Sequence, residues 1–161
     1  MNPGGVRASL NFAPTSGEGD GVVTYEEAFN VQPFSNVLTM MSLTGAQIEA
    51  LLEQQAIASR SRPVLILGVS EGFTFSYNPN GPFGDRIDPA SIKLNSVVLD
   101  PAGSYRIVTS NFLADGGDGF TVFRDGTDRG PAPVEDDLAA LLDYLAANSP
   151  VSPPPDRIAG G

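Results

Sequence analysis

Two glycine-rich segments and two aromatic side chains are the residues of this sequence best suited to binding a small molecule. The segment from Asn2 to Arg7 reads Asn-Pro-Gly-Gly-Val-Arg, and its backbone N–H groups and arginine could together hold an anion. Phe34 and Phe112 lie in predicted loops, and a loop carboxylate at Asp118 stands among glycines. Such a set would suit a nucleoside, because rings stack on a base, a carboxylate accepts hydrogen bonds from sugar hydroxyls and arginine pairs with phosphate.

Each of these features also has an ordinary structural interpretation. Glycine-rich turns are common, and a phenylalanine in a loop more often fills the core than it contacts a ligand. The segment from Asp115 to Phe120 could also be taken for a calcium loop. However, Asp115 and Asp118 do not have the spacing of an EF-hand, and no closing glutamate follows. We therefore favour a tight turn there, and periodicity alone does not establish that these loops converge.

The composition excludes several kinds of site and partner. The 161 residues contain no histidine and no cysteine, which excludes zinc fingers, histidine-ligated metal centres and serine–histidine or cysteine–histidine pairs. With 9 Lys and Arg against 19 Asp and Glu, the net charge is −10. This charge repels phosphate backbones, which argues against a groove for long nucleic acid. No apolar run approaches the roughly 20 residues of a membrane-spanning helix.

Capping boxes and apolar periodicity predict the elements that must position the loops. Thr24 to Glu27 predicts a short helix that ends near Asn30, and Thr44 to Gln47 predicts an amphipathic helix to about Ala58. A stripe of leucines behind an acidic start predicts a third helix, at Leu138, Leu141, Leu142 and Leu145. Strands are predicted at 37–43, 64–69, 73–77, 91–94, 96–99 and 105–110, and surface loops at 15–21 and 111–118.

Short strands in mixed order with these helices predict the fold class. They favour a single α+β domain with a mixed or antiparallel sheet and flanking helices. We expect this domain to span residues 1–158, with residues 159–161 as a tail.

Several segments resemble motifs of the 5′-nucleotidase family, in the same order along the chain. The opening NPGGVR is similar to the family's Asn-x-Gly-Gly-x-Arg segment, and VTYEEAFNVQPFSNVLTMMSL at 23–43 resembles its stretch with Pro-Phe-Gly-Asn before a strand. TGAQI at 44–48 with Leu51 and Leu52 resembles its next helix. NFLADGGDGF at 111–120 resembles the Asn-(Phe/Tyr)-(Leu/Met)-Ala-x-Gly-Gly-Asp-Gly-(Phe/Tyr) signature. Shorter matches at 84–87 and 155–158 extend the resemblance over nearly the whole chain. It implies the substrate-binding, C-terminal domain of the family.

The resemblance implies a role for each matching residue of the glycine-rich signature and of the Pro-Phe segment. Phe34 and Phe112 would sandwich the nucleobase, and Asp118 would contact the ribose. Gly116 and Gly117 would let the backbone approach the ligand, since neither has a side chain in the way.

In the opening motif, Asn2 and Arg7 would contact base and phosphate. Two positions depart from the family pattern: Ser35 replaces the usual glycine, and Ser9 stands where some relatives carry an acidic residue. The family normally has a further segment upstream, with a helix and a second phosphate-binding arginine, and before it a metallophosphoesterase domain. Neither is in this sequence, so we expect an N-terminally truncated domain.

The implied activity belongs to the complete parent protein. It would hydrolyse nucleoside phosphates to nucleoside and phosphate with two divalent metal ions held by the N-terminal domain. This chain would supply substrate binding, without a cofactor, a metal or a catalytic residue of its own, and would be inactive alone. Its expected partners are a nucleoside or nucleotide, the N-terminal domain of the same parent, and a second copy through the truncated face. The resemblance implies a secreted, periplasmic or cell-surface location.

Two other functions stay open at this point. One is a non-enzymatic nucleotide-binding or interaction module, which the missing upstream segment would permit. The other is a calcium-stabilised adhesive domain, suggested by the net charge of −10 and the Asp-Gly turns. The sequence does not distinguish among nucleotides, because stacking on a ring tolerates different bases.

Overall fold

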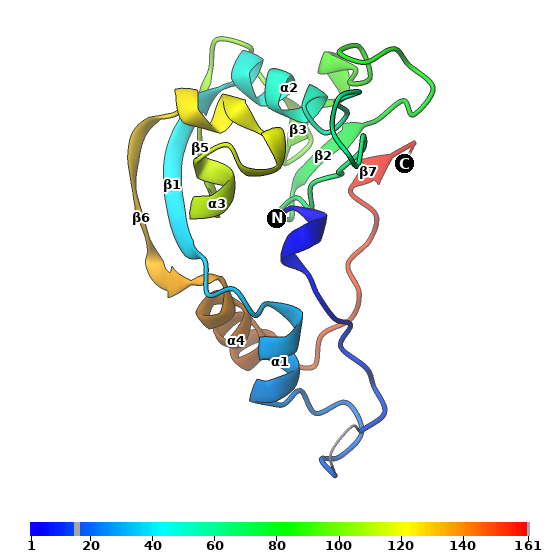
Figure 1. Ribbon diagram of the computed structural model, residues 1–161, viewed down its shortest axis with the longest axis vertical. Coiled ribbons are helices and arrows are strands. Elements are labelled where there is room, and N and C mark those ends of the chain that lie inside the picture. The colour runs from blue at the N-terminus through cyan, green and yellow to red at the C-terminus, as the bar shows by residue number, and fades with distance from the viewer. Residues whose placement is uncertain (15–16, 161) are drawn as a thin grey trace.

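The computed structural model describes residues 1–14 and 17–160, and its central feature is a three-stranded antiparallel sheet of order β5-β1-β6 (Figure 1). The middle strand, β1, spans Val37–Thr44. It pairs with β5 (Ser104–Ser110) on one side and with β6 (Thr127–Asp136) on the other. Alternate residues of β1 are buried, which is the period-2 pattern expected for a half-buried strand.

A second sheet has four short strands in the order β4-β3-β2-β7. They span Val97–Val98, Lys93–Leu94, Phe73–Ser76 and Ile158–Ala159 in that order. β2 and β7 run parallel, whereas the other pairs are antiparallel. The fold is therefore α+β with mixed and antiparallel sheets, as predicted, and the pairing of β7 extends to Ala159 in the expected tail.

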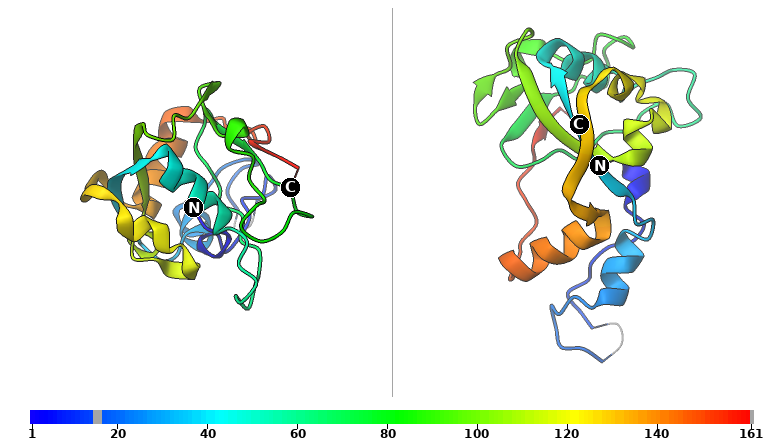
Figure 2. Two further views of the ribbon diagram at one scale, coloured as in Figure 1. Left: turned by 90° about the horizontal axis from the view of Figure 1, so that it is seen from above. Right: turned by 90° about the vertical axis from the view of Figure 1, so that its left-hand side faces the viewer.

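In the part of the chain that the structure describes, four α-helices flank the sheets. α1 (Tyr25–Val31) and α4 (Asp137–Asn148) pack together at the lower end of the molecule in Figure 1, and both views of Figure 2 keep them together. α2 (Gly45–Glu53) lies at the opposite end, and the short α3 (Asn111–Ala114) follows β5 directly. No helix within residues 1–14 and 17–160 has the length and apolar character needed to cross a membrane.

Both predicted capping boxes are present. Thr44 Oγ1 accepts a hydrogen bond from Gln47 N at 3.1 Å, and Gln47 Oε1 accepts one from Thr44 N at 2.8 Å. Thr24 and Glu27 make the same reciprocal pair at the start of α1. Each box satisfies two backbone donors that a helix N-terminus otherwise leaves unpaired, which explains why both helices begin where the sequence predicted.

Replacing Thr44 by alanine tests the contribution of the second box. We expect Thr44→Ala to lower the free energy of unfolding by about 1 kcal/mol, because Gln47 N loses its acceptor. Urea denaturation measures this change. Thr44→Ser keeps the hydroxyl and should lose clearly less; equal losses in the two variants would contradict a capping origin.

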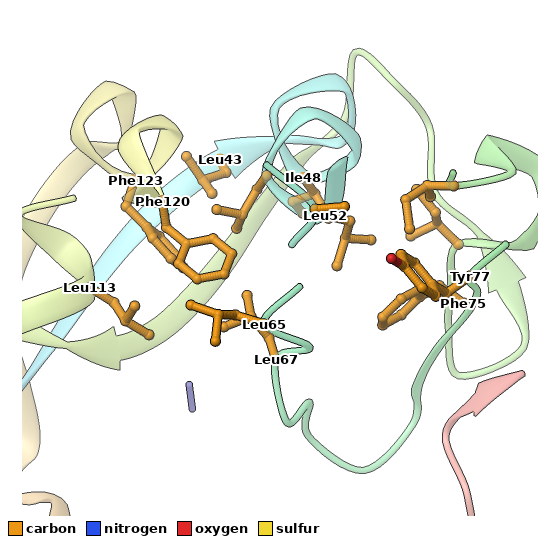
Figure 3. Packing of buried hydrophobic residues seen from close by; sticks show 14 of the residues in the cluster. Leu43, Ile48, Leu52, Leu65, Leu67, Phe75, Tyr77, Leu113, Phe120 and Phe123 are labelled. Atoms are coloured by element: carbon orange, nitrogen blue, oxygen red, sulfur yellow. The ribbon is translucent and has the colours of Figure 1, made fainter. Parts of the chain in front are cut away.

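The hydrophobic core joins α2 to both sheets and to the glycine-rich segment. Leu113 and Phe120, which flank that segment, are buried in the same cluster as Leu43 and Leu52 (Figure 3). Two buried ends therefore fix the loop between them. The core side chains labelled in the close-up are Leu43, Ile48, Leu52, Leu65, Leu67, Phe75, Tyr77, Leu113, Phe120 and Phe123.

The predicted strand at 64–69 is wrong. Leu65 and Leu67 are buried there, but the segment has no neighbouring strand and forms only an isolated bridge, between Val64 and Ala56. Its backbone groups pair with a helix end instead: Leu65 N donates to Gln55 O, and Leu67 N donates to Gln55 Oε1. An apolar run thus lies in the core without belonging to a sheet.

Other boundaries also differ from the predictions. The predicted loop at 111–118 begins with α3 and continues into a 3₁₀ helix at Gly117–Gly119, because Ser110 Oγ caps the helix by accepting from Leu113 N. α2 ends at Glu53 rather than near Ala58. β6 was not predicted, and its glycine, prolines and charged residues explain why. Residues 15 and 16 of the predicted surface loop, and residue 161 of the expected tail, lie outside the described residues.

Candidate functional site

The ends of two paired strands bring the candidate loops to one end of the main sheet. Leu38, near the start of β1, pairs with Ser110 at the end of β5. Phe34 lies just before β1 and Phe112 just after β5, so antiparallel pairing places both at the same end.

A hydrogen bond joins the opening motif to the glycine-rich loop. Asn2 Nδ2 donates to Asp118 Oδ2 at 2.6 Å, and Asn2 is only 6% exposed. Asp118 has a φ of 54°, in the left-handed region, and Gly116, two residues before it, has a φ of 83°. A positive φ disfavours most residues but is tolerated by glycine and aspartate. The residue types at 116 and 118 therefore suit the backbone conformation that the loop adopts.

The ring of Phe112 lies against the backbone of the same loop. A Cβ atom added to Gly117 would be 2.5 Å from Phe112 Cε1, so the ring occupies the space that a side chain would need. Phe112 is 46% exposed, which leaves ring surface open for a planar ligand. Asn2, Phe112, Gly117 and Asp118 therefore form one continuous group.

Arg7 and Phe34 form a second group. The Arg7 guanidinium lies 5.7 Å from the centre of the Phe34 ring, and Arg7 N donates to Val31 O at the end of α1. Phe34 is 52% exposed. Ser35 has a φ of 48°, which explains why glycine would be favoured at this position.

A buried carboxylate that the sequence did not single out holds the Phe34 loop in place. Asp137 Oδ1 accepts from Asn36 N at 3.0 Å, and Asp137 Oδ2 accepts from Asn36 Nδ2 at 2.8 Å. Asp137 N returns a bond to Asn36 O. The start of α4 therefore fixes the segment that carries Phe34.

The two groups lie apart from the cavities that open beside Met1. Among the described residues, no ring contact links Phe34 to Phe112. Two cavities, of about 370 and 340 Å³, open next to Met1, and none of the seven candidate residues lines either of them. The candidate residues therefore form two partly exposed groups, which residues 2–7 connect along the chain.

Arg60 is a further charged residue beside the glycine-rich loop. Its guanidinium lies 5.1 Å from the centre of the Phe120 ring, and Nη2 would be 3.3 Å from a Cβ at Gly119. Burial lowers the pKa of Arg60, and the charge of Asp118 acts in the opposite direction. Sequence reasoning missed Arg60, because its Ser-Arg-Ser-Arg-Pro loop matches no motif.

Two arginines hold the first acidic residue of the loop. Arg129 Nη2 pairs with Asp115 Oδ1 at 2.5 Å, and Arg124 Nε donates to Asp115 O at 2.9 Å. Asp115 is therefore paired with Arg129 and occupies the C-cap position of α3. No group of three Asp or Glu side chains in the part of the chain that the structure describes could hold a metal ion.

Comparison with known proteins identifies the family. Residues 1–125 match the family model described as "5'-nucleotidase, C-terminal domain". The chain belongs to this family. The matched range contains all seven candidate residues.

Two longer relatives match the chain over most of its length. The chain is 31% identical over 159 residues to a 5'-nucleotidase-related protein of Glossina morsitans morsitans, covering 95% of this chain and 27% of the relative. It is 32% identical over 150 residues to the cell wall protein Lmo0130 of Listeria monocytogenes, covering 89% of this chain and 18% of that protein.

The fold of this 5′-nucleotidase C-terminal domain also matches a solved structure. The crystal structure of a 5'-nucleotidase precursor from Thermus thermophilus superposes with a TM-score of 0.78 and 30% identity. The match covers 98% of this chain and 30% of that one. The domain thus spans about a third or less of the relatives that it matches.

Proposed function

We propose that this domain binds the base and ribose of a nucleoside or nucleotide for a 5′-nucleotidase-like phosphohydrolase. The observation that carries the proposal is the Asn2–Asp118 hydrogen bond beside an exposed Phe112 ring seated on Gly117. A base stacks on the open ring, and Asp118 Oδ1 accepts from a sugar hydroxyl while Oδ2 stays bonded to Asn2. Stacking supplies affinity, and the hydrogen bonds supply orientation.

Arg7 would bind the phosphate in this proposal. Its charge-assisted hydrogen bonds suit a phosphate oxygen, and its guanidinium lies over the ring of Phe34, the second proposed base-binding residue. In a chain with a net charge of −10, this local cation offsets a background that repels anions.

The hydrolytic step would belong to another domain of the parent protein. We propose that two divalent metal ions lie in an N-terminal metallophosphoesterase domain, since this chain has no histidine or cysteine to contribute. The chain would then position the nucleotide for the reaction and bind without hydrolysing. A secreted, periplasmic or cell-surface location is part of the proposal, supported by a relative named as a cell wall protein.

Self-association is the remaining proposed partnership. β5 is an edge strand of the main sheet as described, and its residues line the apolar cavity of about 370 Å³. A second copy could cover this face. Light scattering at high concentration decides between a dimer and a monomer, and a monomer contradicts this part of the proposal.

Calorimetric titration with adenosine and AMP tests the binding site. We expect saturable binding by the wild-type chain and a loss of about 10-fold or more in Phe112→Ala, because the base loses its stacking surface. Phe83→Ala is the matched control, since Phe83 is 48% exposed but lies in another loop. Unchanged affinity in Phe112→Ala would contradict the assignment of the base site.

A further inference from the structure

Arg60 connects the end of α2 to the glycine-rich loop. Its Nη2 donates to Gln54 O at 2.7 Å, and Nη1 approaches Gln55 O at 3.5 Å. These carbonyls lie just past the last residue of α2, where a positive charge is favoured. The guanidinium also lies over the Phe120 ring, and its Nη2 would be 3.3 Å from a Cβ added at Gly119.

Within the described residues, the hydrogen bonds of Arg60 leave its buried Nε donor without a partner. The side chain is therefore held by two carbonyls, an aromatic face and the charge of Asp118 rather than by a direct bond to the loop. A planar guanidinium can make the stacking and the two-carbonyl contact at once, which a lysine cannot.

Asp118 needs such support because the glycines of its loop allow the backbone many conformations. Asp118 itself has a positive φ, and glycines stand on both sides of it. Glycines give a backbone many accessible conformations, so the loop alone does not fix the direction of the carboxylate. Asn2 fixes one carboxylate oxygen from one side, and Arg60 faces the next two residues, Gly119 and Phe120.

We propose that Arg60 is a positioning residue that holds Asp118 in place for the sugar of the ligand. The inference rests on the proposed nucleoside site and extends it to a residue outside the matched motifs. Arg60 acts through Asp118 and does not touch the base.

The ratio of adenine to adenosine dissociation constants isolates the contribution of the ribose. We expect Arg60→Gln to lower this ratio about fivefold, because a misplaced Asp118 loses hydrogen bonds to the sugar while stacking of adenine persists. Asp118→Asn should lower the ratio at least as much. Equal losses of adenine and adenosine in Arg60→Gln would indicate a general structural role and overturn the proposal.

Arg62→Gln is the matched control. Arg62 is an exposed arginine of the same loop, so its replacement makes the same change in net charge without the contacts to Gln54 and Phe120. The control should leave the ratio unchanged, and a ratio that falls equally in both variants would overturn the proposal. If Arg60→Gln does not fold, Arg60→Lys keeps the charge and should still lower the ratio.

A measurement without ligand separates this inference from the proposed function. Phe120 N donates to Gly117 O at 3.1 Å within the loop. We expect about 10-fold faster hydrogen exchange of this amide in Arg60→Gln than in Arg62→Gln, with a shifted Asn2 side-chain amide resonance. If the wild-type chain binds neither ligand, the proposed function fails. Unchanged exchange and an unshifted resonance would then overturn the positioning role itself.

Discussion

Alanine at position 117 should remove the base-binding surface and destabilise the loop that carries it. The new Cβ would lie 2.5 Å from Phe112 Cε1 and 2.6 Å from Phe112 O. The backbone oxygen belongs to α3, where the carbonyls on either side of it are held by bonds from Asp115 N to Asn111 O and from Gly116 N to Leu113 O, so it has little room to shift. The Phe112 ring must therefore move away from its contact with residue 117. We expect Gly117→Ala to bind adenosine at least as weakly as Phe112→Ala and to lose about 1–3 kcal/mol of stability.

The measurement for Gly117→Ala is a calorimetric titration with adenosine, paired with urea denaturation. Gly130→Ala is the matched control, because no atom lies within 4 Å of a Cβ at Gly130. The control should change neither affinity nor stability by much. Wild-type affinity in Gly117→Ala would mean that the contact between the ring and the loop does not matter for binding.

The largest loss of stability is expected for Gly45→Ala. A Cβ at Gly45 would collide with the carbonyl of Asp100 and would lie 3.0 Å from Pro101 Cα, so every close atom is backbone. The same turn is bonded to the helix start, since Gly45 N donates to Gly103 O and Ala46 N donates to Pro101 O. Neither the start of α2 nor the turn at 100–103 can move apart without losing these bonds. We therefore expect a loss of about 3 kcal/mol in the free energy of unfolding.

Urea denaturation measures the effect at Gly45, and Ala46→Gly serves as the control. Ala46→Gly changes helix propensity in the same turn without adding an atom, so it should lose only about 0.5–1 kcal/mol. If Gly45→Ala is no less stable than this control, the contact between α2 and the turn at 100–103 is not close enough to exclude a methyl group.

Local signals were enough to predict the elements whose stabilising contacts are near in sequence. The capping boxes at Thr24 and Thr44 predicted the starts of α1 and α2, because each box involves residues three apart. β6 was missed because its glycine, prolines and charged residues are unusual in a strand. Its pairing with β1 overrides these local preferences. The run at 64–69 was misassigned because the N–H groups of Leu65 and Leu67 donate to Gln55 rather than to a neighbouring strand.

The candidate site could be predicted only through resemblance. The hydrogen bond between Asn2 and Asp118 joins residues 116 positions apart, which no periodicity reveals. Arg60 and Asp137 gain their places from the packing of α2 and α4, and neither lies in a recognisable motif. The residue types of the site were readable in the sequence, whereas their supporting contacts depend on the folded chain.

The pairing of β1 sets the order in which this chain can fold during synthesis. β1 is complete at Thr44, but its two partner strands end only at Ser110 and Asp136. A ribosome making the chain therefore releases an apolar central strand long before either neighbour exists. Contacts so distant in sequence also slow folding, since long loops must close before the strands pair. Until then α2, which follows β1 immediately, is the available cover for buried residues such as Leu43.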